Sequence, residues 1–170
     1  MEKALRVLSK QQAFLRDEHK GEGDDAQIKK RILDFQKREV APVESDLNDA
    51  LEELRKAGED KDKENSKRWR ANYDYVYARL LGRLAYVHEY NYLFGQIRKD
   101  GLPPRDPKIH TGWRLASQEK LQSGPEARKL ANDAKKILEK LAKQNQGTPW
   151  EILAKREMMT ALGLQWQPTR

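Results

Sequence analysis

The sequence predicts an all-α protein: an antiparallel long-helix hairpin with a coiled-coil-like seam, a short N-terminal helix and a C-terminal tetratricopeptide-like helix pair. Three observations support this fold class. Apolar residues recur every three to four positions over long segments, which is typical of amphipathic helices. The 10 glycines and 7 prolines gather in a few places between those segments. Charged residues make up 36% and hydrophobic residues 37% of the chain, which suits long helices with one buried stripe.

The first two helices are separated by the glycines of Lys20–Gly23. The first runs from about Glu2 to Glu18, and the second begins after a capping aspartate, Asp24 or Asp25. The apolar positions of the first are Leu5, Leu8, Ala13, Phe14 and Leu15, and those of the second are Ile28, Ile32, Phe35, Val43, Leu47, Ala50, Leu51 and Leu54. Pro42 removes one helical hydrogen bond, so we expect a kink or break near Val40.

The longest predicted helix runs from about Ser66 to Lys99, with Asn65 or Ser66 as its N-cap, and it contains all six tyrosines. One seam is expected to face the second helix, and it consists of Trp69, Tyr73, Val76, Leu80, Leu84, Val87, Asn91 and Phe94. Other faces carry Tyr75, Tyr77, Tyr86, Tyr90 and Tyr92. A helix that is apolar on several faces has several neighbours. These five tyrosines are therefore interaction candidates, unless the C-terminal helix pair covers them.

The remaining chain divides into a Pro-rich connecting loop at 101–125 and a helix pair at 126–170, which we expect to pack on the hairpin (1–100) as one domain. Trp113 is the natural plug that would hold the loop down, and it is also an interaction candidate. Pro125 opens the first helix of the pair and Gly147 closes it. A capping box at Thr148–Glu151 opens the last helix, which is expected to end at Gly163.

Catalytic and metal-binding patterns are missing from the sequence. It contains no HExxH, no phosphate-binding or dinucleotide-binding glycine motif, and no GxSxG. With no cysteine it has neither disulfides nor thiolate chemistry. We therefore expect no enzyme activity, no catalytic residue, no metal and no cofactor. The least favoured alternative is an enzyme with a site around His110, Trp113 and Tyr90.

No segment of the chain resembles a signal peptide, and no apolar run reaches the roughly 18 residues of a membrane span. The sequence thus favours a cytoplasmic protein without a membrane span, unless it is a piece of a larger chain.

Charge is distributed unevenly along the chain. Residues up to Glu64 carry a net charge of −3, and those from Ser66 onward carry +10. One interpretation is internal: the basic long helix pairs with acidic residues of the second helix, namely Asp46, Asp49, Glu52 and Glu53. The other is a nucleic-acid site, because cations beside stackable rings suit single strands. Its basic patch would be Lys67, Arg68, Arg70, Arg79 and Arg83.

Several strings in the second half of the chain are distinctive. They are Ser66–Tyr75 (SKRWRANYDY), His88–Tyr92 (HEYNY), His110–Leu115 (HTGWRL), Gly147–Trp150 (GTPW) and Leu162–Trp166 (LGLQW). Over about residues 66–168 the chain resembles the helical C-terminal region of large planctomycete-type proteins that carry a von Willebrand factor type A domain upstream. The resemblance implies an uncharacterised helical module that is attached to, or works with, an adhesion-type domain. The D-x-S-x-S metal motif of that domain is absent here, and no functional residue can be carried over.

The function expected from these observations is a non-catalytic protein–protein interaction or scaffolding module. Its partner would be another protein or a second copy of the chain, because apolar residues cover more than one face of the long helix. The alternative is a module that binds nucleic acid or another anionic surface through the basic residues of the long helix and the C-terminal half.

Overall fold

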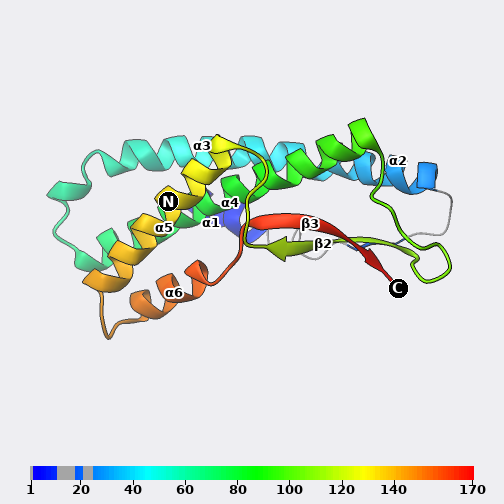
Figure 1. The fold of residues 1–170 in the computed structure, drawn as a ribbon. Helices are drawn as coiled ribbons and strands as arrows, with labels where there is room; N and C mark the ends of the chain where they lie inside the picture. Colours follow the sequence, from blue (N-terminus) through cyan, green and yellow to red (C-terminus); the bar gives the residue numbers. More distant parts are fainter. Residues whose placement is uncertain (1, 11–17, 21–24) are drawn as a thin grey trace.

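The computed structural model describes residues 2–10, 18–20 and 25–170, and it is mainly helical. Its α-helices are α1 (Glu2–Lys10), α2 (Asp25–Phe35), α3 (Ala41–Gly58), α4 (Lys67–Asp100), α5 (Pro125–Gln144) and α6 (Pro149–Met158). A short 3₁₀ turn, Lys61–Lys63, lies between α3 and α4. The fold is not purely α, because β1 (Glu18–Lys20), β2 (Gly112–Gln118) and β3 (Gly163–Thr169) form a small antiparallel sheet in the order β1-β2-β3 (Figure 1).

Helices α3 and α4 form the long hairpin that the apolar periodicity predicts (Figure 1). Near the turn, the Tyr73 hydroxyl donates to the Leu54 carbonyl at 3.0 Å. Far from the turn, the Asn91 amide donates to the Glu44 carboxylate at 2.6 Å, so the two helices run antiparallel. Six of the predicted seam residues are buried: Tyr73, Val76, Leu80, Leu84, Val87 and Phe94. The Ser66 hydroxyl accepts from the Trp69 N–H at 3.2 Å and caps α4, as predicted.

In place of the kink or break expected near Val40, the helix widens into a π-helical turn over Gln36–Val40. The Ala41 N–H donates to the Gln36 carbonyl, five residues earlier. Pro42 lies in the first turn of α3, directly after this wider turn, and the first turn is where a helix best tolerates proline. The chain therefore continues in helical form through a position that would otherwise break it.

The N-terminal helix is shorter than predicted. Helix α1 ends at Lys10, and Ala4, Val7 and Leu8 are its buried residues. A helix that reaches Glu18 is wrong, because Glu18–Lys20 pairs with β2, with Glu18 opposite Arg114. Ala13, Phe14 and Leu15 lie outside the described residues.

The sheet also replaces part of the predicted loop and the end of the predicted last helix. Strand β2 lies inside 101–125, and α6 ends at Met158 instead of continuing to Gly163. Leu115 of β2 pairs with Trp166 of β3, about fifty residues further along the chain. Strands β2 and β3 each offer only two alternating apolar positions, which is too short a pattern to predict a strand.

Helix α5 packs on α4, and α6 packs on α5 (Figure 1). Small buried residues let these helices approach closely: Ala71 and Ala78 on α4, Ala142 on α5 and Ala154 on α6. The predicted capping box at the start of α6 is wrong in detail. The Glu151 carboxylate accepts from the Gly147 N–H at 2.7 Å, and the Thr148 hydroxyl donates to the Asn145 carbonyl at 2.7 Å.

Candidate functional site

A cavity of about 440 Å³ lies where α4, α5 and α6 meet. Its apolar lining includes Leu121, Leu138, Met158 and Leu162, and its charged lining comprises Arg79, Arg83, Glu119, Lys135 and Glu157. Gly82, between the two arginines in sequence, also faces the cavity; a Cβ added there would meet Leu162 Cδ1 at 3.9 Å. The cavity therefore combines an apolar wall with two cations from one helix.

The two arginines lie one helical turn apart on α4 and share one carboxylate. Arg79 Nε lies 3.4 Å from Glu157 Oε1, and Arg83 Nη2 lies 3.9 Å from the same oxygen. The Arg79 and Arg83 side chains are only 17% and 11% exposed. Neither Nε atom has a hydrogen-bond partner among the described residues. Arg79 also lies over the Tyr75 ring, 5.5 Å from its centroid.

The group of Arg79, Arg83 and Glu157 carries a net charge of +1. Burial lowers the pKa of Arg83, and the nearby Glu157 opposes this shift. Lys135 and Glu119, which also line the cavity, carry opposite charges and cancel in the sum. Two guanidinium groups withdrawn from water with one carboxylate between them favour a further anion.

Glu157 was not among the residues that the sequence marked. A signal was present, because Trp150, Ala154 and Glu157 recur at i, i+4 and i+7, which places an acid on the inward stripe of α6. Its partners on α4 lie more than seventy residues away in the chain, and no local pattern connects them. Sequence reasoning could therefore place Glu157 on the inward side of α6 but could not find its partners on α4.

The predicted basic patch is divided among separate places. Arg79 and Arg83 line the cavity described above, whereas Lys67 and Arg70 line another cavity of about 390 Å³ near the α3–α4 turn. Arg68 is exposed. The five side chains thus do not form one continuous basic surface.

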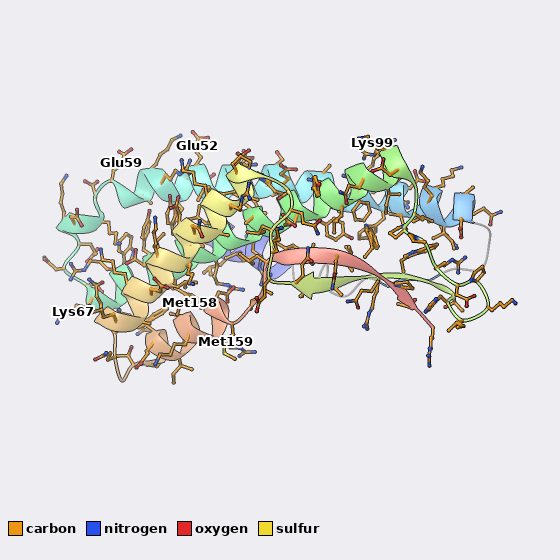
Figure 2. All side chains as sticks on the ribbon, in the orientation of Figure 1. Glu52, Glu59, Lys67, Lys99, Met158 and Met159 are labelled. Atoms are coloured by element: carbon orange, nitrogen blue, oxygen red, sulfur yellow. The ribbon has the colours of Figure 1, made fainter. Side chains whose placement is uncertain are left out.

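Arg79 and Arg83 do not form the ion pairs that were expected between α4 and the acidic residues of α3. Arg79 and Arg83 meet Glu157 of α6. Glu52 is exposed and pairs along its own helix with Lys56 at 3.2 Å. Figure 2 shows Glu52 and Glu59 pointing outward from α3, at the edge of the molecule opposite α6 in that view. Arg79 and Arg83 therefore lie away from Glu52, on the side of α4 that faces α6.

The predicted interaction tyrosines are mostly covered by this chain itself. Tyr86 and Tyr90 are buried, with 7% and 1% of their surface exposed. Tyr75 is half-buried against Trp150 of α6, at a centroid distance of 6.1 Å. Half-buried Tyr77 stacks on Tyr73 and accepts from Arg55 Nε at 3.3 Å. Tyr92 is 38% exposed, so it alone of these tyrosines presents much of its ring to a partner.

Trp113 is fully buried, as the packed form of the 101–125 segment predicts, and so it presents no surface to a partner. Its indole N–H donates to the Pro103 carbonyl at 3.1 Å, and Arg105 lies over its ring at 4.6 Å. His110 Nδ1 accepts from the Asp106 N–H at 3.2 Å. These contacts hold the segment down, and they give no support to a catalytic site around His110, Trp113 and Tyr90.

A second surface borders the cavity on the outer face of α6. Ile152 and Met159 are 70% and 85% exposed, and they lie seven residues apart, which places them on one side of the helix. Exposed Lys155 and Arg156 lie between them. Figure 2 shows Met158 and Met159 at the C-terminal end of α6, where both also line the cavity.

No protein-family model, curated protein or solved structure matches this chain. The resemblance to the region associated with type A domains therefore stays a prediction. Among the described residues, no helix has both the length and the apolar character of a membrane span. Within the same part of the chain, no three His, Cys, Asp or Glu side chains come together as metal ligands would.

Proposed function

We propose that the protein is a non-catalytic interaction module that binds another protein through the outer face of α6. The observation that carries this proposal is the pair Ile152 and Met159, exposed on one side of a short helix beside a cavity. Large apolar side chains are exposed to water at a cost, and the free energy falls when a partner covers them. Methionine is also adaptable in shape and suits binding surfaces.

The charge of this region indicates the chemistry of the partner. Residues 125–170 contain nine Lys or Arg and five Asp or Glu, and Lys155 and Arg156 lie between the two exposed apolar residues. An acidic amphipathic helix would cover Ile152 and Met159 with its apolar stripe and place its carboxylates beside the cations. We therefore assign the surface to an acidic helical segment of a partner protein.

Binding of designed acidic amphipathic peptides tests this proposal. The double variant Ile152→Ser/Met159→Ser should bind at least about tenfold more weakly, because each truncated contact costs about 1 kcal/mol or more. The matched control is Ile109→Ser, since Ile109 is 49% exposed but lies before β2, away from α6. Equal weakening in both variants, or tighter binding of a basic peptide of the same apolar pattern, contradicts the proposal.

The alternative function, nucleic-acid or anionic-surface binding, makes a different prediction in the same experiment. Affinity for a single strand would fall steeply with salt and would drop when Lys67, Arg68 and Arg70 are reversed in charge. It would not depend on Ile152 or Met159. The division of the basic residues between two cavities favours the protein-binding proposal over this alternative.

A further inference from the structure

We propose that the cavity between α4, α5 and α6 is a binding site for a carboxylate that carries a single negative charge and is joined to a short apolar group. This inference does not rest on the proposed function of the α6 surface. It follows from three properties of the cavity: its uncompensated charge, the guanidinium donors that Glu157 does not satisfy, and its mixed lining.

The charge of the site sets the charge of the ligand. Arg79 and Arg83 contribute two positive charges, and Glu157 contributes one negative charge at 3.4 and 3.9 Å. A monoanion completes the balance. A phosphate monoester carries about −1.5 to −2 near pH 7 and would overshoot it. The side chains are mostly buried, so solvent does little to screen the remaining charge.

The guanidinium geometry favours a carboxylate. Arginine binds a carboxylate through two parallel N–H bonds, and one of its two edges is formed by Nε and the neighbouring Nη. The Nε atoms of Arg79 and Arg83 are both buried without a hydrogen-bond partner among the described residues. Glu157 occupies part of this donor set but does not satisfy it. A second carboxylate in the cavity would accept bonds from the parts of the two guanidinium groups that line it.

The rest of the lining sets the body of the ligand. Leu121, Leu138, Met158 and Leu162 form an apolar wall around the charged group. The volume of about 440 Å³ falls within the usual range of small-molecule sites, roughly 300–1,000 Å³. A short alkyl or aryl group attached to the carboxylate would cover this wall, and each buried CH₂ raises affinity about fourfold.

Titration of the intact 170-residue chain with butyrate, hexanoate, octanoate, octanol and sulfate tests the proposal. Heat of binding and the shift in melting temperature are the readouts. We expect affinity to rise along the three acids, with octanol and sulfate both weaker than octanoate. Equal binding of octanol and octanoate, or stronger binding of sulfate, would overturn the proposal.

Variants assign the binding to the arginines. Arg83→Met should weaken octanoate binding at least about tenfold, because a desolvated charged hydrogen bond is lost. Arg68→Met, which changes an exposed arginine of the same helix, should leave it unchanged. A variant that should bind octanoate more tightly separates loss of the site from misfolding. Glu157→Gln removes a negative charge a few ångströms from the ligand, so octanoate binding should tighten by roughly tenfold. Unchanged or weaker binding in a folded Glu157→Gln variant contradicts the proposal.

A comparison of peptides with octanoate shows whether the carboxylate belongs to a peptide C-terminus or to a free carboxylic acid. A short peptide that ends in leucine is compared as the free acid and as the amide, alongside octanoate. Binding of the peptide acid but not its amide assigns the site to a chain terminus, whereas binding of octanoate alone assigns it to a free carboxylic acid. If neither acid binds at millimolar concentration, the cavity is not a carboxylate site.

Discussion

The carboxylate of Glu89 attaches the start of α5 to the middle of α4, and its removal should loosen that attachment. Glu89 is fully buried, and its Oε1 accepts three hydrogen bonds. The donors are the Gln122 N–H at 2.6 Å, the Ser123 N–H at 2.5 Å and the Ser123 hydroxyl at 2.6 Å. These residues directly precede Gly124, the N-cap of α5, so the negative charge also lies near the positive end of that helix dipole.

The cost of losing this group can be estimated from those contacts. A hydrogen bond to a charged group contributes about 1.5–3 kcal/mol. Three such bonds would exceed 4 kcal/mol, but Gln122 is exposed and Ser123 half-buried, so water can reach their donors once the carboxylate is gone. We therefore expect Glu89→Ala to lower the free energy of unfolding by about 4 kcal/mol. Glu89→Gln keeps an acceptor oxygen but loses the charge, and we expect about 2 kcal/mol.

Urea denaturation measures both variants, with Glu52→Ala as the control. Glu52 is an exposed acid on α3, and its removal should change stability by less than about 0.5 kcal/mol. Hydrogen exchange gives a local readout, because the Gln122 and Ser123 amides should exchange faster in both Glu89 variants. If Glu89→Ala is as stable as Glu52→Ala, or if the two amides keep their protection, the reasoning is wrong.

Three further outcomes follow from local geometry and charge. Gly95→Ala should raise the free energy of unfolding by about 0.5–1 kcal/mol in thermal or urea denaturation, because an added Cβ meets nothing within 4 Å on α4; a decrease would contradict this. Gly163→Ala should disrupt the β2–β3 pairing, because its Cβ would lie 2.3 Å from the Lys120 carbonyl oxygen; unchanged near-ultraviolet circular dichroism and melting temperature would contradict it. The pKa of Glu151 is lowered by its hydrogen bond from Lys155, so its stabilising contribution is present at neutral pH and is lost as pH falls through that lowered value. An NMR titration should place this pKa below the ordinary glutamate value of about 4.3 and should find it closer to normal in Lys155→Met.

The helices could be predicted from the sequence because their signals are local. The seam from Tyr73 to Phe94 repeats at steps of three and four over many turns, and each step adds independent support. Ser66 caps α4 through a bond to a residue three positions away, and Pro42 disturbs a helix that its own neighbours define. Such patterns need no knowledge of distant partners.

The sheet could not be predicted for the opposite reason. Strands β2 and β3 are seven residues each, and neither has enough alternation to distinguish it from a loop. What stabilises them is long-range pairing, such as Leu115 with Trp166, and packing of Trp166 on Phe94 at a centroid distance of 5.5 Å. These terms appear only once α4 is in place beside both segments.

Two acids, buried Glu89 and half-buried Glu157, show what a sequence can and cannot predict about a site. Glu89 lies between Ala85 and Leu93 at i−4 and i+4, and Glu157 lies on the stripe of Ala154, so both acids interrupt an apolar face. A carboxylate in such a place must find donors, because burying it alone costs several kcal/mol. The donors differ in kind: Glu89 meets the backbone of the segment that precedes α5, whereas Glu157 meets two arginines. Two backbone N–H groups and the Ser123 hydroxyl donate to Oε1 of Glu89, and no cavity adjoins them among those described above, so this is a structural contact, although Oε2 has no hydrogen-bond partner among the described residues. The two positive charges of Arg79 and Arg83 exceed the single negative charge of Glu157. This excess of positive charge makes the α4–α5–α6 cavity, rather than the Glu89 contact, the candidate binding site.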